Sequence, residues 1–524
     1  MKFSAKNRSS SAYHAQHTYY DLTVIGGGIT GAGIALDASL RGLSVLLIEK
    51  NDFASGTSSK STKLIHGGLR YLKQFEFSLV REVGLERAIL HNLLPHLVVP
   101  EKMLLPIVQN GSLGSRTCAI ALSVYDYLAS VEKKDKKEML NPKDVLKYEP
   151  MLQKAKDLIG GAIYAEYRTD DARLTIELIK EAYAYNATCL NHMEVTACKK
   201  NEQGYSIESK DSCSGQTFSF NSSSVVNAAG PWTDRIINKQ GQSNSKKIFL
   251  SKGVHLVIDR SRLNLKQSLY FDIGDGRMMF AIPRQGKVYF GTTDTEFHGN
   301  LNQIEISLED CSYLISAVNR RFPQANIALE DIESCWAGLR PLIRKSEKST
   351  TEMSRKDEVF IAPSGIISIA GGKLTGFRKM AERVVNIVEQ RLFRKKTPCL
   401  TAYHSFKSKS FTSPSVSTYH NFTYGTAAES ILGQLDPGSD DALIQEYIYC
   451  IDEECCINPL DYFLRRSGKM YFNISAVEQE LELCLKTFKN YLNWNDKQTE
   501  QARKNILESI ERHRLTKIKK ASIN

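Results

Sequence analysis

Near the amino end of the chain, an imidazole, a guanidinium and a phenol stand within six residues, at His66, Arg70 and Tyr71. A neutral imidazole is a common proton acceptor near neutral pH, a guanidinium binds an anionic group through paired N–H donors, and a phenol can hydrogen-bond beside them. A single histidine or arginine is more often structural or solvated, so the neighbouring sequence has to decide. Gly67 and Gly68 lie between them and would let a ligand approach the backbone closely. The stretch therefore predicts a ligand-contacting surface that offers a base and a cation.

Upstream, three glycines have the G-x-G-x-x-G spacing of a dinucleotide-binding turn: Gly26, Gly28 and Gly31. They follow Leu22–Ile25, an apolar run with the length and composition of a buried strand. Each glycine lacks a Cβ atom where the tight turn, the approach of a pyrophosphate or the packing of helix on strand would be blocked by one. The helix that begins here would present its N-terminus to an anion.

A second apolar strand, Ser44–Ile48, completes a βαβ unit and ends at Glu49. The acid stands about 20 residues after the glycines, where an acidic side chain binds the ribose hydroxyls of a dinucleotide. Glycines at this spacing also mark ordinary turns, but here strand, helix, strand and acid follow one another in the required order. Because a carboxylate disfavours a 2′-phosphate, the pattern fits FAD or NAD better than NADP.

Length and composition describe a large globular protein. A chain of 524 residues can form two to four domains, and 42% hydrophobic with 24% charged residues is ordinary for a soluble protein. No apolar run reaches the about 18 residues of a membrane-spanning helix. The start of the chain, MKFSAKNRSSSAYHAQH, is polar and basic without an apolar segment. We therefore expect no secretory signal of the usual kind and a partly disordered tail.

Cysteine spacing and net charge restrict the partners only weakly. Of the 11 cysteines, Cys450, Cys455 and Cys456 cluster, but no histidine lies at ligand spacing from them, so we expect reduced thiols and no metal. The net charge of +11 would suit nucleic acid, anionic lipid or an acidic substrate, and chooses none of them. Because the basic residues lack interleaved aromatic residues on one module, we expect no nucleic-acid partner.

The rest of the chain alternates between helical and strand patterns. Ala229 and Gly230 end an apolar strand, where backbone could lie against a ligand or simply form a tight turn. A second glycine pair, at 371 and 372, precedes a helix and suggests another anion-friendly site. The predicted helices are near 77 onward, 170–187, 377–393, 474–492 and 498–515, and the predicted strands include 160–167, 193–197, 206–224, 225–230, 251–294 in part and 365–370.

Several longer motifs, in order along the chain, resemble one known family. They are GGGITGAGIALDASLRGLSVLLIEK, DFASGTSSKSTKLIHGGLRYLK, VVNAAGPW, SKGVHLVI, GTTDTE, AGLRPL and GGKLTGFRKMAE. Together they resemble the FAD-dependent, aerobic, quinone-linked glycerol-3-phosphate dehydrogenase family from about Tyr20 to about Arg391, and a weaker similarity continues through YFLRRSGKM. HGGLRYL with GGKLT is quite specific to that family, whereas the glycine pattern alone belongs to many flavoproteins.

The resemblance implies an α/β fold of the two-domain flavoprotein oxidase type. It combines a Rossmann-like FAD/NAD(P)-binding domain with a β-rich substrate-binding domain and an α-helical C-terminal domain. The expected ranges are 1–19 for the polar tail, 20–75, 150–245 and 360–393 for the FAD-binding domain, 76–149 and 246–359 for the substrate-binding domain, and 394–524 for the helical domain.

The same resemblance implies a reaction and a location. It implies that sn-glycerol 3-phosphate is oxidised to dihydroxyacetone phosphate by hydride transfer to FAD, and that the electrons pass to a respiratory quinone. It further implies a cytoplasmic protein attached peripherally to the inner face of the cell membrane, and a homodimer is a further expectation. The basic tail 512–520 and the net charge would suit anionic lipid, although many such tails only aid solubility.

Oxidation of a secondary alcohol needs the carbinol carbon held at the flavin, a base for the hydroxyl proton and cations for the phosphate. By resemblance, the substrate pocket comprises Arg70, Tyr71, Arg340, Arg355 and Lys373. We take His66 as the first choice of proton acceptor and His255 as the second. Alternatively, Arg340 lowers the pKa of the alcohol and leaves the proton to water.

The cofactor would lie along the glycine turn, the hydroxyl-rich loop after Glu49 and the second glycine pair. A helix starting at Gly372 would direct its positive end at the flavin N1 and O2 atoms. The candidate cofactor-binding residues are Gly26, Gly28, Gly31, Glu49, Thr57, Ser58, Lys63, Leu64, Val195, Ala229, Gly230, Gly372, Lys373, Leu374 and Thr375.

Three alternatives remain open. The oxidase branch of the family passes electrons to oxygen and makes hydrogen peroxide, but it carries an additional inserted segment that this sequence lacks, which favours the dehydrogenase. An amino-acid or 2-hydroxy-acid oxidase on the same scaffold would not require a phosphate group. A non-catalytic flavin-bound or membrane-scaffold protein would show no flavin reduction by any small alcohol phosphate.

Overall fold

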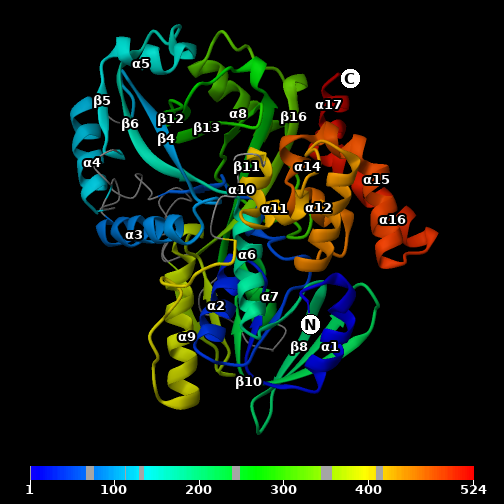
Figure 1. Ribbon diagram of the computed structural model, residues 1–524. Helices are drawn as coiled ribbons and strands as arrows, with labels where there is room; N and C mark the ends of the chain where they lie inside the picture. Colours follow the sequence, from blue (N-terminus) through cyan, green and yellow to red (C-terminus); the bar gives the residue numbers. More distant parts are fainter. Residues whose placement is uncertain are drawn as a thin grey trace.

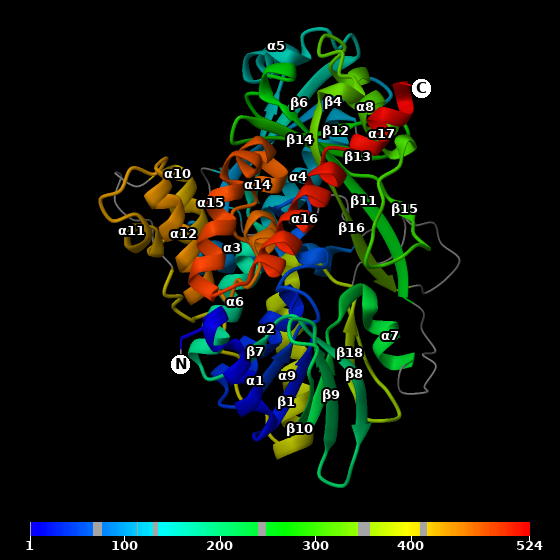
Figure 2. The same cartoon turned by 90° about the vertical axis from the view of Figure 1, so that its right-hand side faces the viewer.

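The computed structural model describes residues 2–66, 76–112, 114–128, 131, 135–238, 248–343, 357–408 and 417–523. Two β-sheets lie one above the other in Figure 1, and a group of C-terminal helices lies beside them. Figure 2 shows the same arrangement from the side. Segments 19–48, 188–227 and 358–370 build the lower sheet, whereas most of the upper sheet comes from 99–168 and 248–343.

The lower sheet has eight strands, and its centre is parallel. The order is β17-β18-β10-β1-β2-β7, in which β18, β10, β1, β2 and β7 run parallel, while β8 and β9 extend the sheet as an antiparallel meander on β10. The strands are β1 (Tyr19–Ile25), β2 (Val45–Ile48), β7 (Thr188–Leu190), β8 (Met193–Lys200), β9 (Tyr205–Asp211), β10 (Thr217–Asn227), β17 (Glu358–Ile361) and β18 (Ile367–Ala370).

Helices α2 (Ile29–Leu40), α6 (Asp171–Ala184) and α9 (Phe377–Phe393) pack together beside this sheet. Every residue of β2 and β18 is buried, as expected of parallel strands that are covered on both faces. The side chains of the three helices and the strands form one apolar core. The predicted βαβ unit and the predicted helix Phe377–Phe393 are confirmed.

The amino-terminal segment is folded, so the expectation of a partly disordered tail is wrong. It forms α1 (Arg8–Gln16), whose residues Ala12 and Ala15 are buried against the lower sheet. The Arg8 guanidinium donates to the Asn191 carbonyl at 2.6 Å and to Asp211 at 2.9 Å. The sequence suggested disorder because the segment is polar and its partners, Asn191 and Asp211, are far away along the chain.

The first residues also contact the C-terminal helices. The Ser4 hydroxyl donates to Asp452 at 2.9 Å, and the Cys455 amide donates to the Phe3 carbonyl at 3.1 Å. The Phe3 ring lies 5.9 Å from the ring of Phe53, in the core beneath α2. The amino terminus thus joins the lower sheet to the helical region.

The upper sheet has ten strands in the order β15-β11-β14-β13-β12-β4-β6-β3, with β16 paired to β11 and β5 to β6. Along β4 the side chains alternate, because Leu104 joins the core beneath α8 while Met103, Leu105 and Ile107 join the core beneath α4. The elements are β3 (Leu64–Ile65), β4 (Val99–Val108), β5 (Glu138–Leu140), β6 (Leu158–Arg168), β11 (Ile248–Asp259), β12 (Ser268–Asp272), β13 (Met278–Arg284), β14 (Lys287–Gly291), β15 (Thr295–Glu296), β16 (Ile332–Ile343), α3 (Phe77–Leu93), α4 (Ser115–Leu128), α5 (Pro142–Tyr148), α7 (Thr233–Asn238) and α8 (Leu308–Arg321).

Two strands of the upper sheet lie in ranges that we assigned to the FAD-binding domain. β6 pairs antiparallel with β4 from Val99↔Arg168 to Val108↔Leu158, and β3 pairs with the end of β6. Sheet membership therefore changes near residue 168, at the start of α6, rather than near 150. The boundaries as domain limits stay a prediction.

The C-terminal region is helical and has its own apolar core. α15 has the predicted bounds, whereas α16 begins earlier than predicted because Asn495 and Gln498 form a capping box. Every helix in the part of the chain that the structure describes is too short or too polar to span a lipid bilayer. The helices are α10 (Thr418–Tyr424), α11 (Ala427–Leu432), α12 (Asp440–Glu453), α13 (Pro459–Asp461), a π-helical turn (Tyr462–Arg466), α14 (Lys469–Phe472), α15 (Ile474–Leu492), α16 (Asp496–His513) and α17 (Thr516–Ile523).

Candidate functional site

A cavity of about 1040 Å³ has walls from both sheets. The carboxyl ends of β1, β2, β10 and β18 form one end, which agrees with the rule that open α/β sheets bind ligands beyond the carboxyl ends of their strands. The faces of β11, β13 and β16 form the other end. The cavity is large enough for an extended dinucleotide together with a small second ligand.

The glycine turn is shaped by close backbone approach. Gly26 has a φ of +113°, and a Cβ atom there would lie 2.5 Å from the Ala228 carbonyl oxygen. A Cβ atom at Gly31 would lie 1.8 Å from the Gly26 carbonyl oxygen. Gly28, the residue before α2, makes no side-chain cap, and the Ile29 amide donates to the Ser58 hydroxyl at 2.9 Å. Gly26 and Gly28 line the cavity, whereas Gly31 lies behind them and lets α2 pack on β1.

Glu49 lies at the end of β2 in the cavity wall and is 9% exposed. One carboxylate oxygen accepts from the Gly27 amide at 2.7 Å and the other from the Asn51 amide at 2.9 Å. Burial raises the pKa of Glu49, and these two hydrogen bonds oppose the rise. The carboxylate is thereby fixed beside the glycine turn, with lone pairs left to accept from hydroxyl groups.

The hydroxyl-rich loop supplies part of the same wall. Thr57, Ser58 and Leu64 line the cavity, and the Thr57 hydroxyl donates to the Leu339 carbonyl at 2.6 Å. Lys63 is not part of the cavity wall: its ammonium is buried and lies 2.5 Å from Asp171 at the start of α6. The sequence could not show this ion pair, because it depends on the pairing of β3 with β6.

The second glycine pair forms a turn and not the start of a helix. Gly371 and Gly372 have φ values of +80° and +79°, in the left-handed region, so neither can belong to a right-handed helix. A 3₁₀ turn, Leu374–Gly376, follows, and α9 begins only at Phe377. The expectation of a helix starting at Gly372 is therefore wrong. The remaining predicted cofactor-binding residues also line the cavity. They are Val195, Ala229, Gly230, Gly372, Lys373, Leu374 and Thr375.

Arg340, on β16, lies at the opposite end of the cavity. One guanidinium nitrogen donates to the Thr293 carbonyl at 3.2 Å and lies 3.4 Å from Asp294, and the other donates to the Thr292 hydroxyl at 3.0 Å. Gly253 leaves room for this group, since a Cβ atom there would lie 2.5 Å from the guanidinium. The Arg340 side chain is 23% exposed, so part of the fork faces the cavity.

His255, on β11, lies in the same part of the wall. Its ring stacks on Trp336 at 4.8 Å with an interplanar angle of 12°, and its Nε2 is 2.9 Å from the Thr62 hydroxyl. Burial, together with the charges of Arg340 and Lys63, holds the pKa of His255 well below the ordinary value. The imidazole is therefore neutral at physiological pH and is a weak base.

His66 also lines the cavity, and it is only partly buried. Its ring lies 6.0 Å from the Phe280 ring in an edge-to-face arrangement. Both candidate bases thus lie in the wall of one cavity. Arg70, Tyr71 and Arg355 lie outside the described residues.

Sequence reasoning missed several residues of the cationic end. Thr292 and Asp294 belong to the GTTDTE motif, to which the sequence alone assigns no role, and both line the cavity. Trp336 faces His255 because β11 pairs antiparallel with β16. Lys60 is a further cation in the wall. Only the register of the upper sheet reveals these neighbours.

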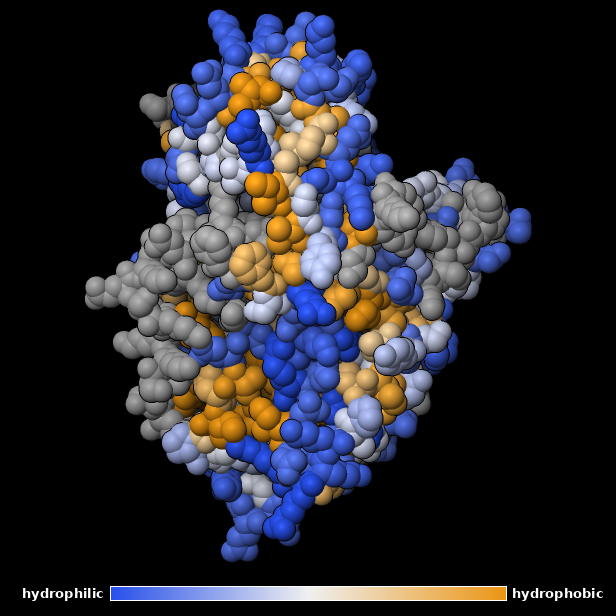
Figure 3. All heavy atoms as spheres, turned by 90° about the vertical axis from the view of Figure 1, so that its left-hand side faces the viewer, coloured by the Kyte–Doolittle hydropathy of each residue, from blue (hydrophilic) through white to orange (hydrophobic). Residues whose placement is uncertain are grey.

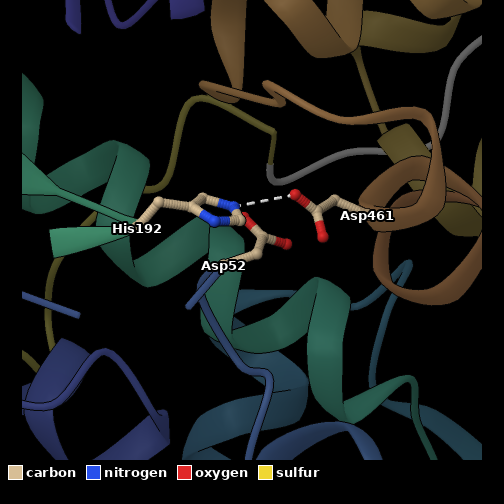
Figure 4. A group of neighbouring side chains, drawn as sticks. All are labelled: Asp52, His192 and Asp461. Carbon is tan, nitrogen blue, oxygen red and sulfur yellow. Dashed lines mark hydrogen bonds and ion pairs between the residues drawn. The ribbon is translucent and has the colours of Figure 1, made fainter. Parts of the chain in front are cut away.

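One group of side chains with metal-ligand spacing occurs among the described residues: Asp52, His192 and Asp461 (Figure 4). His192 lies 2.9 Å from Asp461, but both carboxylates are also bonded to guanidinium groups, those of Arg465 and Arg466. The positive charges already balance the carboxylates, so the arrangement suits an ion-pair network better than a divalent cation. Burial raises the pKa values of the clustered thiols at Cys450, Cys455 and Cys456, which keeps them protonated.

Comparison with known protein families gives two matches. Residues 21–377 match the FAD dependent oxidoreductase family, and residues 400–499 match the C-terminal domain of alpha-glycerophosphate oxidase. The first match covers nearly all of both sheets and the whole cavity wall except Met380, and the second covers most of the helical region.

Two relatives resemble the chain over nearly its whole length, and a third shares its fold over about three quarters of it. The aerobic glycerol-3-phosphate dehydrogenase of Bacillus subtilis is 41% identical over 96% of this chain and 97% of its own. The solved structure of the glycerol-3-phosphate dehydrogenase from Bacillus halodurans, complexed with FAD, has a TM-score of 0.82 at 38% identity and covers 98% of both chains. L-alpha-glycerophosphate oxidase from Mycoplasma pneumoniae, at 18% identity, 74% of this chain, 99% of its own and a TM-score of 0.59, shares the fold. The expected fold class is confirmed.

Proposed function

Because the chain belongs to the family of FAD-dependent glycerol-3-phosphate dehydrogenases, we propose that it oxidises sn-glycerol 3-phosphate to dihydroxyacetone phosphate with FAD as its cofactor. The observation that carries the proposal is the extent of the similarity, which reaches 41% identity over 96% of this chain and 97% of the Bacillus subtilis relative. A cavity with a dinucleotide-type turn at one end and cations at the other supports it.

The residues of the glycine end fit FAD. The glycine end combines a turn that a Cβ atom at Gly26 would block, a helix N-terminus at Gly28 and a fixed carboxylate. Such features hold pyrophosphate and ribose. Gly26 and Gly28 would admit the pyrophosphate, and Glu49 would accept from the ribose hydroxyls. When bound, FAD supplies the hydride acceptor.

The cationic end would bind the substrate phosphate. Arg340 is held by Thr292 and Thr293, so its fork is oriented before a ligand arrives. Lys373 lines the same cavity. We propose that Arg70, Tyr71 and Arg355 complete this pocket, as the sequence resemblance implies.

We propose His66 as the group that takes the hydroxyl proton. His255 binds a proton weakly, because it is buried and lies near two cations. It suits a different task, which is to accept or donate a hydrogen bond as a neutral imidazole beside Thr62. His66 is less buried, and it also lines the cavity.

We propose a respiratory quinone as the electron acceptor. The match of residues 400–499 to the C-terminal domain of alpha-glycerophosphate oxidase makes oxygen the second candidate. Measured side by side, quinone reduction and peroxide formation decide between them: stoichiometric peroxide in air without quinone reduction would establish the oxidase.

We also propose peripheral membrane attachment through the side of the molecule that carries α3 and α4. On α4, Ile120 and Tyr127 lie one heptad apart and are 66% and 84% exposed, and Phe77 on α3 is 45% exposed. Figure 3 shows this side, where hydrophobic patches lie among hydrophilic side chains. Replacing Ile120 and Tyr127 by aspartate should reduce co-sedimentation with anionic vesicles. A homodimer and a cytoplasmic location stay predictions.

The decisive test is anaerobic reduction of the purified protein. Flavin absorption should be present, and glycerol 3-phosphate should bleach it whereas glycerol should not. A protein that takes up FAD but is bleached equally by glycerol would not recognise the phosphate. A protein that takes up no FAD would overturn the proposal as a whole.

A further inference from the structure

Asp52 is a buried carboxylate that lies three residues after Glu49 and is 0% exposed. It is not part of the cavity wall. Arg465 donates to it at 2.7 Å, and Arg466 donates to its two oxygens at 2.8 and 3.1 Å. These consecutive arginines come from the π-helical turn Tyr462–Arg466, which lies more than four hundred residues further along the chain. The helical C-terminal region is thus bonded to the stretch that follows β2.

That stretch is bonded directly to the glycine turn. The Gly27 amide donates to the Glu49 carboxylate at 2.7 Å, and the Ala54 amide donates to the Gly27 carbonyl at 3.0 Å. The Asn51 amide donates to the other oxygen of the Glu49 carboxylate at 2.9 Å. A displacement of Asp52 would therefore move both ends of the turn 49–54, and with them Glu49 and Gly27.

Asp52 also fixes the neighbouring corner between β7 and β8. The Asn191 side-chain amide donates to Asp52 at 3.1 Å and to the Cys455 carbonyl at 3.0 Å. The backbone amides of His192 and Met193 donate to the Asn51 carbonyl at 2.7 Å and to the Glu49 carbonyl at 2.8 Å. Met193 and the residues after it line the cavity at the Glu49 end. The glycine turn, the stretch after β2 and the corner between β7 and β8 are thereby connected to one carboxylate.

We propose that Arg466, with Arg465, is a positioning residue for the cofactor: by holding Asp52, the C-terminal helical region sets the geometry of the ribose-binding end of the cavity and hence the affinity for the ADP moiety of FAD. This inference rests on the proposed function, because it takes FAD as the ligand. Figure 4 shows the carboxylates of Asp52 and Asp461 close together. Arg465 forms ion pairs with both of these carboxylates. The ion pairs of Arg465 and Arg466 with Asp52 therefore connect the glycine turn to α13.

A buried ion pair can also serve stability alone, and the experiment has to separate the two roles. A matched control exists at the far end of α2. Arg41 forms ion pairs with Asp37 at 2.6 Å and with Glu389 at 2.9 Å, and its side chain is as buried as that of Arg466. It is not part of the cavity wall. Arg41→Met therefore removes a comparable buried charge without contact to the ribose-binding end.

The test measures binding of FAD and of ADP to flavin-depleted protein, together with thermal stability, for wild type, Arg466→Met and Arg41→Met. We expect Arg466→Met to weaken the binding of FAD and of ADP by the same factor, at least about tenfold, because the misplaced hydrogen bonds lie at the ribose. Arg41→Met should lower the melting temperature but leave both dissociation constants within about twofold of wild type. At saturating FAD, the KM for glycerol 3-phosphate should stay unchanged in both variants.

If Arg466→Met and Arg41→Met lose similar stability and bind FAD equally well, the inference is overturned. The ion pair of Arg466 with Asp52 is then purely structural. Weaker binding of FAD with unchanged binding of ADP would also overturn the inference, because the effect would then lie at the flavin. If Arg466→Met does not fold, Arg466→Lys keeps the charge but cannot bond both oxygens of Asp52 as a fork, and the same comparison applies. Failure of wild type to bind FAD would refute the proposed function instead.

Discussion

At the glycine end of the cavity, much of the wall comes from the short stretch between β1 and Leu64, whereas at the cationic end it comes from strands that are far apart in sequence. The glycine end is held by backbone amides and one buried carboxylate, Glu49. The cationic end depends on charged and aromatic side chains, Arg340, His255 and Trp336 among them, whose neighbours are set by the pairing of β11 with β14 and β16. We expect the first end to recognise a ligand by its shape and the second by its charge. Substitutions at the two ends should therefore change different constants.

The largest effect should come from the proposed base. In His66→Gln, kcat should fall by about 100-fold or more, since general-base catalysis contributes this much, and the FAD content should stay normal. The acid limb of the pH–rate profile should disappear with it. His255→Gln is the matched control and should lower kcat by about tenfold or less, because a neutral hydrogen-bonding side chain remains there. If His255→Gln proves the more damaging change, the assignment of the two residues reverses.

At the same end, Arg340→Lys should lower kcat/KM for glycerol 3-phosphate by about 100-fold, through both a higher KM and a lower kcat. An ammonium cannot reproduce a fork that is oriented by Thr292 and Thr293. Arg277→Lys is the control, because Arg277 lines the same cavity but pairs with Asp275 at 2.7 Å. Steady-state kinetics with the flavin spectrum as a check would show this, and unchanged constants would remove Arg340 from the pocket.

At the glycine end, Gly31→Ala should act on FAD and on stability instead. The new methyl group would lie 1.8 Å from the Gly26 carbonyl oxygen, so α2 and β1 have to move apart, at a cost of about 1–3 kcal/mol. The melting temperature should fall and FAD should dissociate more readily, while the KM of the fully loaded enzyme stays the same. Gly114→Ala, where no atom lies within 4 Å of the new methyl, should be neutral. Equal behaviour of the two variants would contradict the close approach of helix and strand.

The smallest effect should be a pH dependence from Lys60, which lines the cavity and whose ammonium forms no hydrogen bond or ion pair with the described residues. Burial, with Arg465, Arg512 and Lys50 nearby, lowers its pKa to about 8. The ammonium loses its proton as pH rises through that value, so the KM for an anionic substrate should rise a few-fold above pH 8, and Lys60→Arg should remove this dependence. The cost of the buried charge to folding is largest below pH 8 and vanishes as pH rises toward the ordinary lysine pKa.

The same contrast explains what the sequence could predict. The strand, glycine turn, helix and Glu49 are local, so their spacing predicted the βαβ unit correctly. The partners of Lys63 and His255 depend on strand pairing between distant segments, and local patterns do not show which distant strands pair with one another. Gly372 was misjudged because a glycine pair before a helix fits both an N-terminus and a left-handed turn, and only the backbone angles decide. Arg340 and Lys373 were found through family motifs and not through spacing.

The contacts of the first residues with the last third of the chain have a consequence for biosynthesis. The Phe3 carbonyl and the Ser4 hydroxyl are bonded to Cys455 and Asp452. During translation at about 5–20 residues per second, the amino-terminal segment must wait on the order of tens of seconds before those partners leave the ribosome. These two contacts therefore form only late in synthesis, and a chain that is released before Cys455 is made would lack the link between its amino terminus and the helical region.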